Sequence, residues 1–192
     1  MIAILKYNAG NVRSVANALS RLGYSYCLTD DKKELQKAKK VILPGVGEAG
    51  SAMQYLKEKK LDIAIQQLDQ PVLGICLGLQ LLCRSSEESH TNCLGIFNTE
   101  VKKFPPADVV PHTGWNNLLR AEGALFQNTA KNDDFYFVHS YYAGLCEDTV
   151  ALCDYILPFS AALRKNNFYA TQFHPERSAG AGEQVLKNFL HL

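Results

Sequence analysis

The 192-residue chain lacks the features that mark membrane, secreted and nucleic-acid-binding proteins. No apolar run approaches the roughly 20 residues that a membrane span needs. Residues 1–6 lack the basic start, long apolar stretch and small-residue cleavage site of a signal peptide. An excess of one charge is also absent, because 20 basic residues balance 19 acidic ones. We therefore expect a soluble, cytoplasmic globular protein with one domain over residues 1–192.

Paired cysteine motifs are absent as well. The six cysteines lie at positions 27, 76, 83, 93, 146 and 153, and none forms a C-x-x-C pair. His90 lies close to Cys93, but no second pair completes a four-ligand zinc site. A chain of this length needs no disulfide framework to fold. We therefore expect no metal and no other cofactor, and we expect most of these thiols to pack as small apolar side chains.

The first half of the chain alternates between strand and helix patterns. Short apolar runs at residues 2–5, 24–28, 41–43 and 71–75 predict strands. Between them lie a predicted helix that Asn11 caps and Gly23 ends, a short lysine-rich helix after Asp31, and a helix over about residues 51–68. The run at 71–75 is apolar on both faces, as the centre of a parallel sheet requires. This alternation predicts a doubly wound sheet with right-handed connections.

Beyond residue 92 the pattern changes to consecutive strands. Strand patterns cover residues 94–104, 134–138, 150–156, 160–163 and 168–173, with a hairpin turn at 164–167 and a last helix near 182–190. Together the two halves predict an α/β fold whose central sheet is mixed, mostly parallel and flanked by helices.

One cysteine lies in the segment Gly74-Ile75-Cys76-Leu77-Gly78, which follows a predicted buried strand and precedes an apolar helical pattern. This is the glycine-x-nucleophile-x-glycine pattern of a nucleophile elbow, in which the glycines permit a sharp turn. A cysteine at the start of a helix feels the positive end of the helix dipole, which favours the thiolate. The alternative interpretation is a buried cysteine between two turn glycines.

A candidate base lies near the end of the chain, in Gln172-Phe173-His174-Pro175-Glu176. Proline keeps the preceding residue out of the helical region, and in extended backbone positions i and i+2 project to the same side. Glu176 can therefore orient the imidazole of His174 while the other ring nitrogen faces a thiol. The alternative interpretation is a structural histidine–glutamate pair at a strand end.

A third segment, Pro44-Gly45-Val46-Gly47, follows a predicted strand. Glycines in such a loop can turn a peptide N–H outward to hold a developing oxyanion, although proline-glycine is also a common turn. In an open α/β sheet, ligands bind beyond the carboxyl ends of the strands, where all three segments lie. A nucleophile, an oriented base and an oxyanion donor indicate acyl transfer through a thioester.

The segments Gly74-Ile-Cys-Leu-Gly-Leu-Gln80 and Phe173-His-Pro-Glu-Arg-Ser178 resemble the signatures of class I, triad-type glutamine amidotransferases. Three further segments, together with Pro44-Gly-Val-Gly47, resemble the family of glutaminase subunits of imidazole glycerol phosphate synthases. These segments are Gly10-Asn11-Val-Arg-Ser14, Pro111-His-Thr-Gly-Trp-Asn116 and Phe137-Val-His-Ser-Tyr141.

The resemblance implies a catalytic triad of Cys76, His174 and Glu176, with glutamine forming a glutamyl thioester on Cys76. It also implies three further groups of residues. Gln80 and the backbone at Gly47, Ser140 and Tyr141 hold the substrate; Leu77 N–H and a peptide of Gly45-Val46-Gly47 form the oxyanion hole; Asn11, Trp115, Asn116 and Tyr136 lie toward a partner subunit.

The resemblance covers essentially the whole chain, which leaves no residues for a domain that uses the ammonia. It therefore implies a heterodimer with a separate cyclase chain of (β/α)8-barrel fold. That cyclase makes imidazole glycerol phosphate and aminoimidazole carboxamide ribotide in histidine biosynthesis.

Several aromatic residues near these segments have a second interpretation. A histidine that ends an aromatic strand is more often structural than catalytic, so we expect His139 to be structural and His112 to be an interface or turn residue. The context Gly-Trp-Asn-Asn indicates a surface turn for Trp115, with core packing as the alternative. Residues 135–137 are expected in a strand core, with Tyr136 as the exception.

Three other functions remain open at this point. A paralogous glutaminase that serves an aminosugar pathway would keep the same triad and differ in its partner. A cysteine peptidase or deglycase could use the same elbow, although it would not be expected to have His-Pro-Glu near the C-terminus. An inactive binding module is disfavoured because every triad position is filled.

Overall fold

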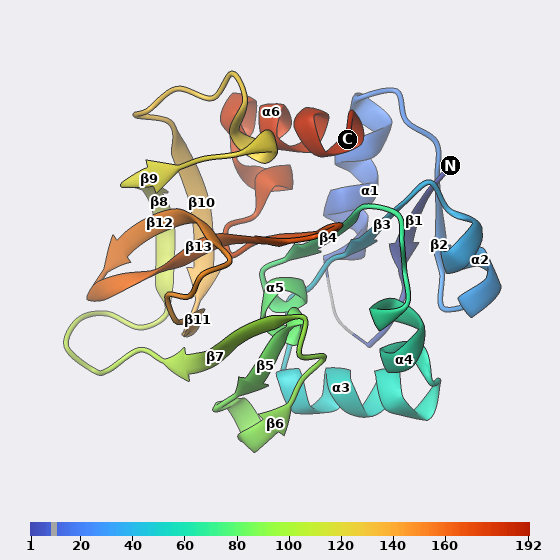
Figure 1. Cartoon of the computed structure of the whole chain (residues 1–192). Helices are drawn as coiled ribbons and strands as arrows, with labels where there is room; N and C mark the ends of the chain where they lie inside the picture. Colours follow the sequence, from blue (N-terminus) through green and yellow to red (C-terminus); the bar gives the residue numbers. More distant parts are fainter. Residues whose placement is uncertain (9–10) are drawn as a thin grey trace.

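The computed structural model describes residues 1–8 and 11–192 (Figure 1); Gly10, part of one resembling segment, lies outside the described residues. The helices are α1 (Val12–Arg21), α2 (Lys32–Lys37), α3 (Ala49–Glu58), α4 (Leu61–Gln66), α5 (Leu77–Leu82) and α6 (Ala179–Leu190). The 3-10 turns are η1 (Glu88–His90), η2 (Ala124–Phe126) and η3 (Pro175–Arg177). The strands are β1 (Ile2–Leu5), β2 (Tyr26–Thr29), β3 (Lys40–Leu43), β4 (Val72–Ile75), β5 (Cys83–Ser86), β6 (Thr91–Asn92), β7 (Phe97–Lys103), β8 (His112–Asn117), β9 (Arg120–Ala121), β10 (Asp134–His139), β11 (Tyr141–Ala143), β12 (Thr149–Tyr155), β13 (Leu157–Lys165) and β14 (Phe168–Thr171).

The central sheet has the strand order β2-β1-β3-β4-β14-β13-β12-β9. The pairs from β2 through β14 are parallel, and the pairs β14–β13, β13–β12 and β12–β9 are antiparallel. The predicted mixed, mostly parallel sheet is therefore confirmed. Strand β14 pairs directly with β4, so the chain that follows β14 emerges beside the chain that follows β4. This pairing brings the two sequence motifs together.

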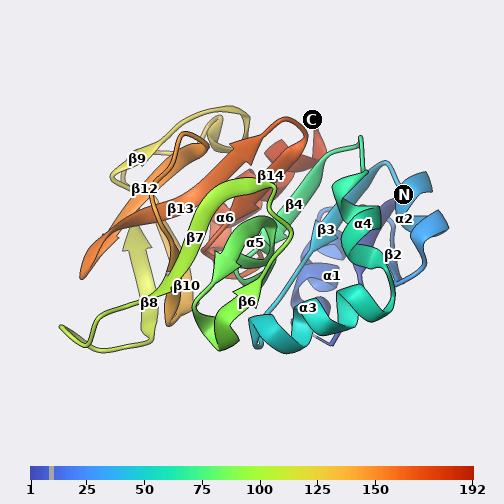
Figure 2. The same ribbon diagram turned by 60° about the horizontal axis from the view of Figure 1, so that its bottom comes forward.

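Helices cover both faces of this sheet, with α1 and α6 on one side and α3, α4 and α5 on the other (Figures 1 and 2). Alternate residues of β1 serve the two layers: Ile2 and Ile4 pack into the cluster that contains α1 and α6, whereas Ala3 and Leu5 pack into the cluster with α3 and α5. The period-two alternation of a strand explains this division. Burial on both faces explains why β1, β3 and β4 read as continuous apolar runs.

Two smaller sheets lie beside the helices, against the antiparallel strands of the central sheet. One has the order β11-β7-β5-β6, and the other pairs β8 with β10 in antiparallel register. Figure 2 shows β7, β5 and β6 in front of the central sheet. Strand β10 ends at His139 and β11 begins at Tyr141, so the two small sheets meet at Ser140.

Several local predictions require correction. The predicted helix over residues 51–68 is two helices, because Lys60 takes a left-handed conformation with φ 53°. The second strand begins at Tyr26 rather than Tyr24, since the Tyr24 N–H donates to the carbonyl of Leu19 and completes the end of α1. Asn11 occupies the N-cap position of α1, but its side chain makes no capping hydrogen bond.

The polar strands were missed by the sequence pattern. Strands β5, β6, β8, β9 and β11 lie outside the predicted ranges or were interpreted as turns. Trp115 lies within strand β8 and not on a surface turn, although it is 54% exposed. His112 also lies in β8 rather than in a turn, and its side chain is buried. Within the described residues, no helix is long and apolar enough to cross a membrane.

Candidate active site

Cys76 lies on a sharp turn between β4 and α5. Its backbone has φ 53° and ψ −103°, a conformation that a non-glycine residue keeps only where its surroundings hold it. A Cβ on Gly78 would lie 2.0 Å from the carbonyl oxygen of Leu43, and a Cβ on Gly74 would lie 2.7 Å from that of Gly78. The glycines therefore allow α5 to pack directly on the sheet, and the predicted strand–turn–helix geometry is present.

His174 and Glu176 form a buried pair next to this turn. Nδ1 of His174 lies 2.9 Å from Oε1 of Glu176, and both side chains are almost fully buried. Burial disfavours a charged imidazole, but the negative charge of Cys76 and the Glu176 carboxylate outweigh it and raise the pKa of His174 to about 10. Among the described residues, Nε2 of His174 has no hydrogen-bond partner. This nitrogen is free to exchange a proton with the thiol.

The buried side-chain amide of Gln172 contacts the thiol of Cys76. The sequence pattern predicted no role for this residue. Nε2 of Gln172 lies 3.5 Å from Sγ of Cys76. Nε2 of Gln80 donates to Oε1 of Gln172 at 3.3 Å and to the carbonyl oxygen of Tyr141 at 3.0 Å. Gln172 has no exposed surface and Gln80 has very little. The two amides connect the nucleophile to the strand that lines the cavity described next.

The thiol opens into a cavity of about 290 Å³. The predicted substrate residues Gly47, Gln80, Ser140 and Tyr141 all line it, so the structure brings them together with Cys76. The remaining lining residues are Val46, Leu77, Glu88, Pro111, Val138 and His139.

Glu88 is a second residue that sequence reasoning missed. It supplies the one carboxylate among the residues lining the cavity, and its Oε2 accepts from the Ala49 N–H at 2.8 Å. Burial, with a contribution from the charge of Glu48, raises the pKa of Glu88. The sequence signal was weak, because Glu87 and Glu88 resemble an ordinary solvated pair after the elbow helix.

One of the predicted oxyanion donors, the Leu77 N–H, is paired within the protein. The Leu77 N–H donates to the carbonyl oxygen of Gly45 at 3.3 Å. The Tyr7 hydroxyl donates to the neighbouring Pro44 carbonyl, and burial and the Cys76 charge raise the pKa of Tyr7. Val46 and Gly47 line the cavity, whereas Gly45 does not. A free Leu77 N–H therefore requires the Gly45 carbonyl to turn away.

Three of the four predicted partner residues surround the Glu176 end of the triad. Nδ2 of Asn11 donates to Oε1 of Glu176 and lies 3.4 Å from Nδ1 of His174. Trp115 lines a hollow together with Glu176, and its ring meets the Tyr136 ring edge-on at 5.9 Å between centroids.

Asn116 lies apart from these three residues. Strand alternation turns its side chain to the other face of β8, where its Nδ2 donates to the carbonyl oxygen of Asp154 at 3.1 Å.

The two buried histidines form a chain of fixed direction. Nδ1 of His139 must donate to the Tyr141 carbonyl oxygen, 2.8 Å away, so its Nε2 accepts from Nδ1 of His112 at 3.0 Å. Burial lowers the pKa of His139 to about 3 and that of His112 to about 4, so both rings are neutral at pH 7. Both nitrogens of His139 are engaged, which fits the structural role expected for it.

The comparisons with known proteins agree with this geometry. The family model "Glutamine amidotransferase class-I" matches residues 4–192. The chain is 56% identical to the imidazole glycerol phosphate synthase subunit HisH of Bacteroides fragilis (strain YCH46), over all of this chain and 99% of that protein. It is 47% identical to the HisH subunit of Pasteurella multocida (strain Pm70), over 98% of this chain and 96% of that one. The chain belongs to the HisH family of class I glutamine amidotransferases.

Solved structures of more distant proteins share the fold of this family. The crystal structure of a glutamine amidotransferase superposes with a TM-score of 0.77 at 21% identity, covering 99% of this chain and 97% of that one. The structure of PurLQS from Thermotoga maritima gives a TM-score of 0.71 at 18% identity, covering 99% and 97%. At this identity the likeness concerns the fold alone.

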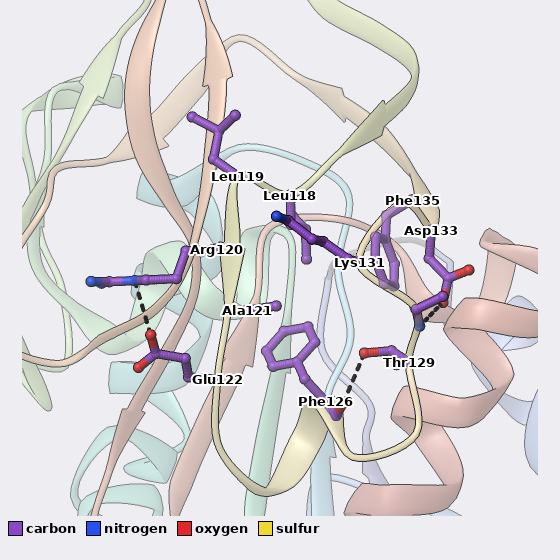
Figure 3. Close-up of a pocket in the computed structure, with 11 residues that line it drawn as sticks. Leu118, Leu119, Arg120, Ala121, Glu122, Phe126, Thr129, Lys131, Asp133 and Phe135 are labelled. Atoms are coloured by element: carbon purple, nitrogen blue, oxygen red, sulfur yellow. Dashed lines mark hydrogen bonds and ion pairs between the residues drawn. The ribbon is translucent and has the colours of Figure 1, made fainter.

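A larger hollow lies elsewhere on this amidotransferase fold, beside β9 (Figure 3). Its lining includes no cysteine or histidine, and the guanidinium of Arg120 faces the carboxylate of Glu122 at 3.7 Å. It therefore offers no cysteine–histidine pair for thioester chemistry. Among the described residues, no group of three or more His, Cys, Asp or Glu side chains is arranged to hold a metal ion.

Proposed function

We propose that this chain is the glutaminase subunit of an imidazole glycerol phosphate synthase, which hydrolyses glutamine to glutamate and ammonia. One observation carries the proposal: the thiol of Cys76 lines a cavity beside the buried His174–Glu176 pair. Of the six cysteines, Cys76 alone lines this cavity. The HisH relatives, named as subunits of this synthase, support the assignment of the pathway to histidine biosynthesis.

In the first half of the reaction, Sγ of Cys76 attacks the side-chain carboxamide carbon of glutamine. The thiol has already given its proton to Nε2 of His174, because a pKa of about 10 keeps this ring protonated at pH 7, and on attack the carbonyl oxygen becomes an oxyanion. The C–N bond then breaks as His174 returns the proton to the leaving nitrogen. Ammonia leaves, and a glutamyl thioester remains on Cys76.

In the second half, a water molecule attacks the thioester carbonyl carbon. His174 takes a proton from this water, and the C–S bond breaks when the tetrahedral intermediate collapses. The thiolate of Cys76 and the imidazolium of His174 are regenerated, and the new carboxylic acid loses its proton to solvent and leaves as glutamate. Glu176 holds Nδ1–H of His174 at 2.9 Å, so Nε2 stays directed at the reacting atoms through both halves.

The cavity residues supply groups for both ends of the amino acid. Both N–H groups of the Gln80 amide are used by Tyr141 and Gln172, so its Oε1 remains as an acceptor for the substrate ammonium group. The carboxylate of Glu88 is a second acceptor for this ammonium. The backbone at Gly47, Ser140 and Tyr141 then faces the substrate carboxylate.

The loop Gly45-Val46-Gly47 provides a means of regulating glutamine hydrolysis. The Leu77 N–H is paired with the Gly45 carbonyl, so a turn of the peptide between Gly45 and Val46 both frees this donor and presents a second one. Gly45 and Gly47 allow such a turn at low steric cost. We place the trigger at the partner face formed by Asn11, Trp115 and Tyr136; the expected contact of Asn116 with the cyclase would come from the other face of β8.

The partner is a cyclase of (β/α)8-barrel fold in a heterodimer with this chain. It joins the ammonia to a phosphoribulosyl formimino carboxamide nucleotide and releases imidazole glycerol phosphate and aminoimidazole carboxamide ribotide. Coupling of the two sites avoids wasteful hydrolysis of glutamine, so we expect the isolated chain to be slow and the partner to accelerate it.

Labelling with a glutamine-like chloroketone tests the nucleophile. We expect a single adduct on Cys76, because burial raises the pKa of Cys83 well above its usual value and that of Cys153 to about 12. Peptide mapping by mass spectrometry locates the adduct, and excess glutamine serves as the protection control. Adducts of equal yield on Cys83 or Cys146, or labelling that glutamine does not slow, would contradict the proposal.

A further inference from the structure

The mechanism above leaves one group at the nucleophile unused. Gln172 directly follows β14, and its side-chain Nε2 lies 3.5 Å from Sγ of Cys76. The side chain is fully buried and does not line the substrate cavity. Its hydrogen bonds go to Cys76 and Gln80. Burying an amide beside a reacting sulfur costs desolvation free energy, so we expect the contact to contribute to function.

A backbone carbonyl fixes which end of this amide faces the sulfur. The carbonyl oxygen of Tyr141 can only accept, so the Gln80 atom that faces it at 3.0 Å is the nitrogen. The same nitrogen faces Gln172 at 3.3 Å, so the Gln172 atom on that side is Oε1. The Gln172 atom at Sγ is therefore Nε2, a donor. His139 also donates to this carbonyl and helps to hold it in place.

We propose that Gln172 is a further catalytic residue, an amide donor to Sγ of Cys76 that stabilises the thiolate and holds the sulfur between the carboxamide carbon and His174. This inference rests on the proposed glutaminase function and extends it. A hydrogen bond to a charged acceptor is about twice as strong as one between neutral groups, so the contact favours the attacking thiolate over the neutral thiol. Gln80 and the Tyr141 carbonyl act as positioning groups for the donor.

The other end of β14 offers a matched control. Nδ2 of Asn167, just before the strand, donates to the carbonyl oxygens of Leu68 at 2.6 Å and Gln70 at 2.9 Å. This amide joins two loops and contacts no reacting group. Gln172→Met removes the donor to sulfur, whereas Asn167→Leu removes an amide whose contacts are structural.

The test compares these variants in the full chain with the cyclase present. For Gln172→Met we expect kcat for glutamine hydrolysis to fall about ten- to a hundredfold, while KM stays within about twofold because Gln172 is outside the cavity lining. At pH 7 iodoacetamide should label Cys76 about tenfold more slowly in this variant, which a purely structural role would not cause. Asn167→Leu should lower the melting temperature and leave kcat per folded enzyme and the labelling rate unchanged.

Gln172→Glu covers the case in which the methionine variant does not fold. At pH 8.5 its carboxylate can still accept from Gln80 but offers no N–H to sulfur, so we expect a loss of kcat at least as large. Cys76→Ser is the control and should be inactive. If it is, a Gln172→Met or Gln172→Glu enzyme with wild-type kcat and labelling rate would overturn the inference. A Cys76→Ser enzyme with wild-type hydrolysis would instead overturn the proposed function itself.

Discussion

At the scale of single residues, the site divides work between two buried groups. Among the described residues Nε2 of His174 has no hydrogen-bond partner, and the pKa of the ring is raised to about 10, so the protonated ring can pair with a thiolate. Glu176 accepts a hydrogen bond from Nδ1 of that ring and a second one from the side-chain amide of Asn11. The imidazole moves the proton, whereas the carboxylate orients and stabilises it.

This division predicts an order of damage. His174→Ala should lower kcat for glutamine hydrolysis by about five to six orders of magnitude. The loss for Glu176→Gln should be smaller than this by about one to two orders of magnitude, because a carboxamide oxygen can still accept from Nδ1–H. Steady-state ammonia release by the two folded variants measures the difference. Circular dichroism spectra are the control for folding. A Glu176→Gln enzyme slower than His174→Ala would show that the roles are wrong.

At the scale of elements, strands β8 and β10 place a neutral histidine pair at the cavity wall, which His139 lines. His112 and His139 are register partners across these strands, and the Tyr141 carbonyl sets the direction of their hydrogen bonds. Because burial lowers the pKa of His139 to about 3, the folded protein keeps this ring neutral where the unfolded chain, near pKa 6.5, binds a proton.

The pair therefore predicts loss of stability in acid. A lowered histidine pKa leaves stability unaffected above about pH 6.5 and reduces it as the pH falls toward the folded-state pKa. His139 alone should lower the free energy of unfolding by about 2 kcal/mol between pH 7 and pH 5. Urea unfolding of the wild type and of His139→Asn over this range measures it, and the variant should depend less on pH. Parallel curves for the two proteins would refute the assignment.

The sequence predicted the parallel half of the fold well, because β1, β3 and β4 are buried on both faces and leave continuous apolar runs. It failed for β8, whose sequence His-Thr-Gly-Trp-Asn-Asn is held in place by pairing with β10 rather than by its own apolar pattern. The break between α3 and α4 at Lys60 could not be predicted, because no glycine or proline lies there.

The candidate site shows the same limit. Cys76, His174 and Glu176 were accessible to sequence reasoning because their motifs have fixed local spacing. Gln172 and Glu88 were given no role because their contacts depend on side chains from other elements. The expected cap at Asn11 failed for the same reason: its amide reaches Glu176, 165 positions along the chain, instead of its own helix.

At the scale of the whole molecule, the parallel pairing of β4 with β14 brings two distant motifs to one sheet edge. The cavity lies on one side of the triad, and Asn11, Trp115 and Tyr136 gather at the Glu176 end. The site for glutamine and the proposed partner face are therefore different surfaces that share the triad. This separation is what an enzyme needs if one chain releases ammonia and another uses it.

The nitrogen source used by the Cys76→Ala complex tests this two-site account most directly. The variant chain is combined with the cyclase and its nucleotide, and product formation is measured with glutamine and, separately, with ammonium salt. We predict that glutamine-dependent formation of imidazole glycerol phosphate is abolished, while ammonia-dependent formation stays within about twofold of the wild-type complex, because we propose that the acceptor site lies on the other subunit. Equal loss with both nitrogen sources, or full activity with glutamine, would contradict it.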